Sequence, residues 1–441
     1  MSRSQLTDLP LREAIGRLAW PAMGSMLLLN VFQLIDAFWV GRLGTEALGG
    51  LSAATFFVWS LHSIGMLAGT GVNAVVARRV GERQAADAGF AAAHGLGLAV
   101  ALGLATAAVV LPLEAILIGL LDLGPGVERS ALAYLTPVLC GMPIITVTYA
   151  MEAIFRGSGD TRTPMWVLGG TLVLNGLLDP LLIFGAGPVP ELGIAGAAWA
   201  TVIAHGIGVL VGLRLLARRE VRPRRSPIRP ALIATLIRVG LPIGLTNLLF
   251  CAIYIVLTPI ISDFGDAAVA AIGVGHRIEG LAYFPCVGFS TAAATLVGQY
   301  LGAGQPGTAD RAAWLATRYG AVLVAGLSLI YLAFAEPIYR IFSTDAQVVV
   351  VGAGYLRIIA LFEVAMALEV VLEGAFSGAG DSLPPMAVGV PLTAARVPAA
   401  YLLSRRWGVT GVWWAISVST LLKGAIVALW FRTGRWKRLA V

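Results

Sequence analysis

The chain has 441 residues, of which 58% are hydrophobic and only 12% are charged, whereas a soluble globular protein carries about 25% charged residues. Together with a mean hydropathy of +0.84, this composition excludes a soluble globular fold and indicates a polytopic membrane protein. The formal net charge of +7 comes largely from arginines at connections between apolar runs, which indicates membrane topology rather than a nucleic-acid partner.

Apolar runs long enough to cross a bilayer, roughly 20 residues each, recur twelve times along the chain. Their centres lie near Leu27, His62, Val100, Gly141, Asn175, Ala204, Asn247, Tyr283, Val322, Phe362, Ala394 and Thr420. The sequence therefore predicts an all-α integral membrane protein with twelve transmembrane helices. Arginines concentrate in alternate connections, which are expected to be cytoplasmic, so both termini are predicted to face the cytoplasm.

The first predicted span, Leu18 to Gly41, holds a single charge, Asp36, with Gln33 one helical turn away. A charge at mid-membrane costs about 2.5–3.5 kcal/mol, so such residues usually face a cavity and mark an ion or substrate pathway. Pro21 lies earlier in the same span and either lets the span bend when the pocket around Asp36 is neutralised or is an inert kink. The preceding stretch lacks a cleavable signal pattern, so this span is expected to remain as an anchor.

The fifth predicted span, Met165 to Phe184, also carries one charge, Asp179, with Asn175 four residues before it. Residues four apart share a helical face, so the amide and the carboxylate are predicted to lie one above the other. Pro180 cannot donate its backbone nitrogen, which frees the carbonyl of Gly176 as a further cation ligand and should bend the helix. The alternative is that Asp179 is a buried acid satisfied by neighbouring hydroxyl or backbone groups.

The eighth predicted span contains Arg277 and Glu279, which are two residues apart and therefore on different helical faces. Each needs a partner elsewhere, and the two are interpreted either as a structural clamp or as part of the coupling machinery. The cysteines lie inside apolar runs and the histidines are isolated, a pattern that predicts no disulfide and no metal site.

An internal repeat organises the twelve spans into two sets of six. Pro21 aligns with Pro242, and the same offset, called the repeat offset below, superposes Phe155 to Met165 on Phe376 to Met386. The alignment predicts two six-helix lobes related by a pseudo-two-fold axis along the membrane normal, as parallel repeats that suit alternating access. The expected boundaries are 1–217 for the N-terminal lobe, 218–231 for a basic cytoplasmic linker and 232–441 for the C-terminal lobe.

The repeat also acts as an internal control for the two acids. At the repeat offset, the second-lobe counterparts of Asp36, Asn175 and Asp179 are Leu257, Arg396 and Ala400. The shared scaffold therefore does not need the acids, which favours a function specific to the first lobe. Two carboxylates in one low-dielectric pocket repel each other, and a proton or a sodium ion can relieve this repulsion. We expect the ion and a positively charged cargo to compete for the site.

Several segments resemble the multidrug and toxic compound extrusion family. They are NVFQLIDAFWVGRLG, the loop RGSGDTRTPM, VLNGLLDPLLIFG and GIAGAAWATV, in this order along the chain. The second-lobe segment HRIEGLAYFPCVGFSTAAATLVGQYLGAGQ looks most like the DNA-damage-inducible branch of that family. The resemblance implies secondary antiport without a cofactor, in which cationic drugs or toxic metabolites leave as protons or sodium ions enter.

By motif match, the resemblance assigns the cation-site threonine of the family to Thr201. Its hydroxyl would complete an oxygen cage for sodium with Asp36, Asn175 and Asp179. We further expect a monomeric, multi-pass protein of the bacterial cytoplasmic (inner) membrane.

The chain is not expected to be an enzyme or an ATP-driven pump. Its two lysines lie outside any Gly-x-x-x-x-Gly-Lys-Ser/Thr loop, so the energy should come from an ion gradient. One alternative is a lipid-linked oligosaccharide flippase of the same superfamily, which would need a cationic cavity for pyrophosphate and is disfavoured by the first-lobe acids. The other is a membrane-embedded enzyme acting on a prenyl phosphate, which normally needs an Asp-rich or His/Ser cluster that is not evident here.

Overall fold

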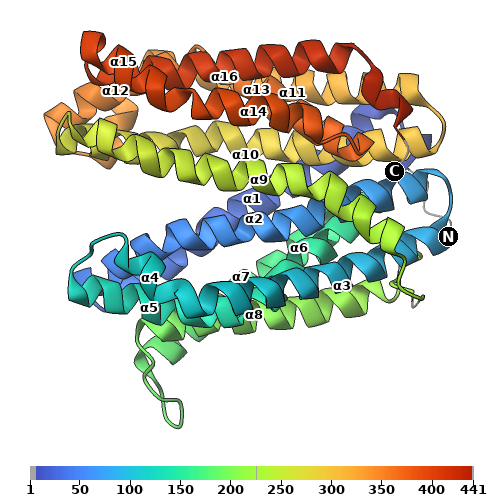
Figure 1. The fold of residues 1–441 in the computed structure, drawn as a ribbon, viewed down its shortest axis with the longest axis horizontal. Coiled ribbons are helices and arrows are strands. Elements are labelled where there is room, and N and C mark those ends of the chain that lie inside the picture. The colour runs from blue at the N-terminus through green and yellow to red at the C-terminus, as the bar shows by residue number, and fades with distance from the viewer. Residues whose placement is uncertain (1–5, 225, 440–441) are drawn as a thin grey trace. The chain divides into compact units, whose positions relative to one another are not determined.

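The computed structural model describes residues 6–224 and 226–439, apart from the side chain of Phe56, and almost all of them are helical (Figure 1). The α-helices are α1 (Leu11–Gly41), α2 (Thr45–Gly81), α3 (Ala85–Val110), α4 (Glu114–Gly119), α5 (Pro125–Cys140), α6 (Met142–Gly157), α7 (Arg162–Phe184), α8 (Ile194–Leu216), α9 (Pro230–Ser262), α10 (Asp266–Gly302), α11 (Pro306–Phe342), α12 (Ala346–Ala360), α13 (Glu363–Ala379), α14 (Leu383–Ala394), α15 (Arg396–Trp407) and α16 (Val409–Arg432). Three short 3-10 helices are η1 (Leu6–Asp8), η2 (Leu111–Leu113) and η3 (Arg435–Arg438). The described residues contain no β-strand, only an isolated bridge between Ala186 and Val189.

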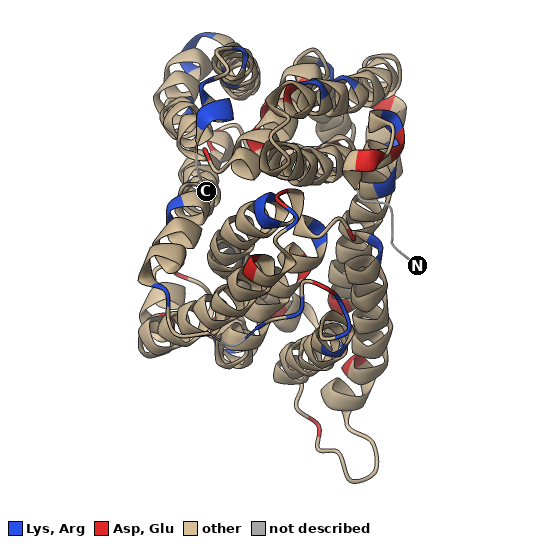
Figure 2. Cartoon of the chain, turned by 90° about the vertical axis from the view of Figure 1, so that its right-hand side faces the viewer, with Lys and Arg blue, Asp and Glu red and all other residues tan. Residues whose placement is uncertain are grey.

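The helices are long and apolar enough for a polytopic membrane protein. Within the described chain, 10 of the candidate spans are long enough to cross a membrane without a sharp bend. Two more are pairs of helices bent by 56° at a short break, α5 with α6 and α12 with α13. The chain therefore has up to 12 spans, which confirms the predicted all-helical membrane fold. Most of the ribbon carries neither acidic nor basic side chains, as an apolar solvent requires (Figure 2).

Helix boundaries follow the repeat found in the sequence, with α1–α8 as the first repeat and α9–α16 as the second. The starts of α2 and α10 are separated by the repeat offset, and so are those of α3 and α11, α5 and α12, α6 and α13, and α7 and α14. Both α2 and α10 follow a glycine with positive φ, Gly44 at 113° and Gly265 at 89°. Other residues seldom adopt this backbone region, so a glycine at this turn fixes the start of each helix.

Contacts within the chain divide it into two compact units. The N-terminal unit is Gly24–Gly244, and the C-terminal unit holds the residues up to Met23 and from Leu245 onward. Helices α1 and α9 therefore each contribute residues to both units. The six-helix lobes with boundaries at residues 217 and 232 stay a prediction.

Candidate functional site

Four of the predicted site residues come together inside the N-terminal unit. Asp36 lies on α1, Asn175 and Asp179 lie on α7, and Thr201 lies on α8. Asn175 and Asp179 are 0% exposed and Asp36 is 6% exposed. Residues that are far apart in the sequence thus form one buried polar group among apolar helices.

A chain of hydrogen bonds joins these side chains. The amide nitrogen of Asn175 donates to Asp179 Oδ1 at 3.2 Å and to the hydroxyl of Thr201 at 3.3 Å. Thr201 in turn donates to Asp36 Oδ2 at 3.5 Å, and the hydroxyl of Tyr134 on α5 donates to the same oxygen at 3.4 Å. These five residues, from four helices, are called the acidic cluster below.

Small residues let the helices of the acidic cluster approach closely. Gly169 and Gly176, on one face of α7, lie opposite Leu28 and Ile35 of α1, where an added Cβ would be 3.7 Å and 3.6 Å from those side chains. On the other side, a Cβ at Gly208 of α8 would overlap only the hydroxyl oxygen of Thr171 on α7. Small residues are common where membrane helices pack, and here they line the contacts of α7 with α1, which carries Asp36, and with α8, which carries Thr201.

The two carboxyl groups of the acidic cluster interact directly. Asp36 and Asp179 act on each other electrostatically and, when one of them is protonated, through a hydrogen bond. Asp36 Oδ1, Asp179 Oδ2 and Asn175 Oδ1 are buried and accept no hydrogen bond from the described residues. A buried polar atom without a partner costs about 1–3 kcal/mol. A proton on one carboxyl, or a small cation held by these oxygens, would remove that cost.

The prolines predicted for this site act on the backbone. α7 continues through Pro180 to Phe184, so this proline does not end the helix. Because proline has no N–H, the carbonyl of Gly176 loses its helical hydrogen bond one turn before the proline. Pro21 is buried inside α1, in the part of the helix that belongs to the C-terminal unit.

Three other predicted residues lie outside the acidic cluster. Gln33 is exposed, although it is one helical turn from the acid on α1. On α10, Arg277 is exposed, whereas Glu279 is half-buried and accepts a hydrogen bond from the hydroxyl of Tyr355 at 3.2 Å. In the part of the chain that is described, no ion pair joins Arg277 to Glu279.

Tyr134 belongs to the acidic cluster but was not among the predicted site residues. The signal that marks it is the repeat, because Tyr134 and Tyr355 are equivalent at the repeat offset. Each donates its hydroxyl to an acid of its own unit, Tyr134 to Asp36 and Tyr355 to Glu279. A tyrosine kept at the same place in both repeats therefore indicates an acid within reach.

The acidic cluster offers oxygen ligands only. Among the residues that are described, no group of three or more His, Cys, Asp and Glu side chains is arranged to hold a metal ion. Two carboxylates, an amide and a hydroxyl are instead a set of hard oxygen atoms, which suits a proton or a hard cation rather than a soft transition metal.

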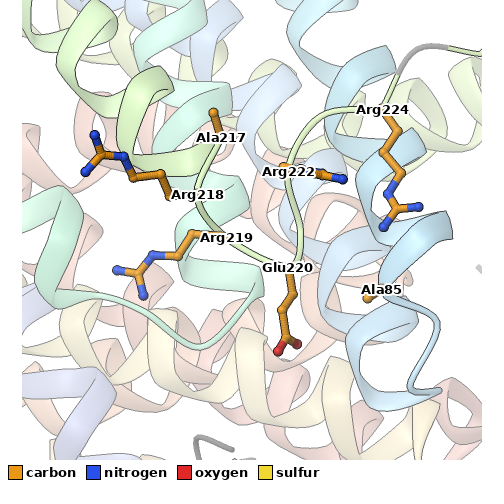
Figure 3. A pocket seen from close by; sticks show the side chains of 7 residues that line it. All are labelled: Ala85, Ala217, Arg218, Arg219, Glu220, Arg222 and Arg224. Atoms are coloured by element: carbon orange, nitrogen blue, oxygen red, sulfur yellow. The ribbon is translucent and has the colours of Figure 1, made fainter. Parts of the chain in front are cut away.

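A cavity of about 420 Å³ lies at the predicted linker (Figure 3). It is lined by Ala85, Ala217, Arg218, Arg219, Glu220, Arg222 and Arg224. Arg219 forms a 2.7 Å ion pair with Asp160. The side chains of Arg218 and Arg219 point away from Ala85, whereas the side chain of Arg224 points toward it (Figure 3). The arginines diverge, and Arg219 fastens the linker to the loop before α7.

An all-helical fold with an internal repeat and charged groups buried inside its spans defines a class of protein, the integral membrane transporters. Comparison with known proteins identifies the family. The family model described as MatE matches residues 21–181 and again residues 242–402, once in each repeat. A Thermotoga maritima relative named “Probable multidrug resistance protein NorM” is 30% identical over 98% of this chain and 94% of its own length. The chain belongs to the MATE family of transporters.

Two further comparisons concern another relative and the fold. A Shewanella oneidensis relative named “FAD transporter” is 27% identical over 96% of this chain and 94% of its own length. The outward-facing structure of a multidrug resistance MATE family transporter of the MOP superfamily is 24% identical, with a TM-score of 0.91 over 100% of this chain and 99% of that chain. The fold and the family resemblance are confirmed, and the chain is a transporter rather than an enzyme.

Proposed function

We propose that the chain is a secondary active antiporter that exports cationic amphiphilic compounds, such as drugs or toxic metabolites, in exchange for protons or sodium ions. The proposal is carried by three buried oxygens, Asp36 Oδ1, Asp179 Oδ2 and Asn175 Oδ1, which accept no hydrogen bond from the described residues. Two carboxylates that form no ion pair with any described residue, in a membrane-spanning region, favour a positive ligand. The name of the Thermotoga maritima relative, a multidrug resistance protein, supports a drug-like cargo.

Competition for the acidic cluster couples the two fluxes. A proton or sodium ion that enters from outside neutralises the carboxylates, so a cationic cargo loses its counter-charge and leaves. Release of the ion to the inside restores the negative charge and lets the next cargo bind. One inward charge supplies about 2.3 kcal/mol per 100 mV of membrane potential. Pro21 gives α1 a point at which the helix can bend as the cluster is neutralised.

We also propose the topology that the sequence predicts. Arginine-rich connections that alternate along the chain support two cytoplasmic termini in a bacterial inner membrane. Two six-helix lobes that expose this site alternately to each side, in a monomer, suit the parallel repeat. The segment from His276 to Gln305 supports membership of the DNA-damage-inducible branch of the family.

Export of a cationic dye by vesicles that hold the full-length protein tests the proposal. A pH gradient and a sodium gradient, each collapsed separately, identify the coupling ion. Asp36→Asn and Asp179→Asn should each lower gradient-driven transport on the order of a hundredfold. Each variant removes a buried carboxylate that would bind the cation, and losing one partner of a buried charge pair costs about 3 kcal/mol. Transport at the wild-type rate in both variants would end the proposal.

Glu191→Gln is the matched control for these variants. Glu191 is an exposed acid of the N-terminal unit that lies in the connection between α7 and α8. Its loss changes the net charge as much as either aspartate variant does, but leaves the acidic cluster intact. Transport should therefore stay near the wild-type rate, and an equal loss would assign the effect to overall charge.

A further inference from the structure

The C-terminal unit buries a cation where the N-terminal unit buries an amide. Arg396 is the first residue of α15, directly after the break that separates this helix from α14, and it is 3% exposed. It is the repeat counterpart of Asn175, which lies at the centre of the acidic cluster. The same position in the fold therefore belongs to an acidic group in one repeat and is basic in the other.

All hydrogen-bond partners of Arg396 are neutral hydroxyl groups. Its Nε donates to Ser419 Oγ at 2.7 Å, one terminal nitrogen donates to Thr420 Oγ1 at 2.9 Å, and the other donates to Tyr254 Oη at 3.2 Å. The described residues provide no ion pair for this guanidinium group. Arg396 is thus a buried positive charge without a paired counter-ion.

Two acidic side chains of the same unit, Glu369 and Glu279, are engaged with other partners. Glu369 forms a 2.6 Å ion pair with Lys423 of α16, and Glu279 accepts a hydrogen bond from the hydroxyl of Tyr355. Both acids reach the surroundings of Arg396 only at longer range, through their electrostatic effect on Tyr254. A buried charge in a spanning helix is costly unless it is paired, and such residues mark substrate or ion pathways.

Hydrogen-bond donors remain available around Arg396. A guanidinium group has five N–H donors, and the three hydroxyl partners use one on each nitrogen, which leaves one on each terminal nitrogen. Ser419 and Thr420 donate their own hydroxyl hydrogens to the carbonyl of Ile416, at 2.7 Å and 3.1 Å. The hydroxyl hydrogen of Tyr254 has no acceptor in the described chain. Two N–H groups and one O–H group are therefore free to bind an acceptor.

Tyr254 lies beside the guanidinium group of Arg396. The guanidinium carbon lies 5.9 Å from the centre of the Tyr254 ring, and this ring is only half-buried. Thr420 is also half-buried, and the exposed ring of His276 packs edge-on against Tyr254 with their centres 5.0 Å apart. The side chains around the guanidinium group are therefore more exposed than Arg396 itself.

We propose that Arg396, Tyr254 and Thr420 form an anion-binding subsite that takes the carboxylate of a zwitterionic amphiphile. The two free N–H donors lie on the two terminal nitrogens, one on each, and a guanidinium group can use this pair of nitrogens to bind both oxygens of a carboxylate. Tyr254 adds a third donor, and Thr420 holds the guanidinium in place. The proposal rests on the export function proposed above and narrows its cargo to compounds that carry an acidic group beside the positive charge.

The test compares two forms of one rhodamine dye, its free acid and its methyl ester, which share a cationic ring system and differ only in the carboxylate. Fluorescence anisotropy measures binding of each form to the purified full-length protein. Arg396→Gln should weaken binding of the free acid about tenfold or more, the size of effect expected for hydrogen bonds between charged groups. Binding of the ester should change less than about twofold.

Two further variants separate the subsite from the fold. Tyr254→Phe keeps every charge and removes only the O–H donor, so it should weaken free-acid binding about threefold to tenfold and spare the ester. Arg405→Gln removes an exposed positive charge from the same helix and should leave binding of both forms unchanged. If Arg396→Gln does not fold, Tyr254→Phe decides the question alone.

The outcomes distinguish the subsite from the export function. Free-acid binding that is unchanged in the folded variants of Arg396 and Tyr254, or weakened equally for acid and ester, would overturn the subsite. Dye export by vesicles is measured separately. A protein that binds the free acid through Arg396 but exports neither form retains the subsite and loses the proposed export function.

Discussion

The two repeats share a backbone plan but not a polar interior. α2 and α10 each have 37 residues, and the bent pairs α5–α6 and α12–α13 both turn by 56°. Yet the N-terminal unit buries Asp36 and Asp179 together, whereas the C-terminal unit buries Arg396 and pairs Lys423 with Glu369. Most helix starts are common to both repeats, whereas the buried polar side chains differ between them.

Turns between helices show the same contrast. Gly193 and Gly408 precede α8 and α16 with φ of 58° and 61°. The two repeats therefore use the same glycine turn, although these glycines are 408 − 193 = 215 residues apart and the repeat offset is 242 − 21 = 221. The polar side chains nearby do not correspond, since Thr201 follows the first turn and Ile416 lies at the matching distance after the second. Scaffold and site have therefore diverged separately.

Two equivalent glycines test the scaffold that both repeats share, and their replacement should give the largest change in stability. Gly157 and Gly378 are equivalent, but a Cβ at Gly378 would overlap the carbonyl oxygen of Ala294, whereas a Cβ at Gly157 would lie 3.0 Å from the carbonyl oxygen of Asn73. Gly378→Ala should lower the free energy of unfolding by about 1–3 kcal/mol, and Gly157→Ala should lower it less. Thermal unfolding of the purified protein measures both.

Gly97→Ala is the control for this pair. Gly97 lies inside α3, and nothing is within 4 Å of an added Cβ. Alanine favours a helix over glycine by about 1 kcal/mol, so this variant should be neutral or slightly more stable. If Gly157→Ala lowered the free energy of unfolding as much as Gly378→Ala does, the packing around the two glycines would be equally tight.

Most of the fold could be predicted from the sequence, because a bilayer forces each span to be a long apolar helix. Ten of the predicted centres fall inside helices, and the other two, Gly141 and Phe362, fall in the breaks of the bent pairs. Hydropathy cannot locate such a break, since one or two residues barely change the mean over a window. Nor does it show that α1 and α9 change units partway, because long-range packing decides this.

The acidic cluster was easier to predict than its surroundings. Asp36 and Asp179 stand out because each is the only charge in its apolar run, and Asn175 follows from helical spacing. Thr201 came only from the family resemblance, since a threonine in a membrane helix carries no signal of its own. Gln33 is exposed despite its spacing, because residues three apart are rotated by about 60° and can lie on either side of a boundary.

The equivalent tyrosines sharpen the comparison at the level of function. Tyr134→Phe removes a donor to Asp36, and Tyr355→Phe removes a donor to Glu279. If the acidic cluster carries the coupling ion, the first variant should shift the proton or sodium concentration at half-maximal dye export about fivefold, since one hydrogen bond is worth about 1 kcal/mol. The second should shift it less than about twofold, and the opposite order would place the coupling ion in the C-terminal unit.

Asp160 and Asp381, which are equivalent loop acids, should give the smallest changes in stability, and the two changes should have opposite signs. Asp160 accepts hydrogen bonds from the backbone of Arg162 and Thr163 and pairs with Arg219, so Asp160→Asn should lower the free energy of unfolding by about 1 kcal/mol. Burial raises the pKa of Asp381, which means that its ionised form is less stable in the folded chain than in the unfolded one.

The contribution of Asp381 to the free energy of unfolding is therefore fully present below the pKa that its carboxyl has in the unfolded chain. It is lost as the pH rises through the higher pKa that the same carboxyl has in the folded chain. At neutral pH, Asp381→Asn removes the buried charge, so it should raise the melting temperature slightly, and this difference should disappear in acid. Melting curves of both variants at neutral and acidic pH measure the effect. A loss of stability in Asp381→Asn as large as that in Asp160→Asn would mean that the second loop holds its acid as firmly as the first.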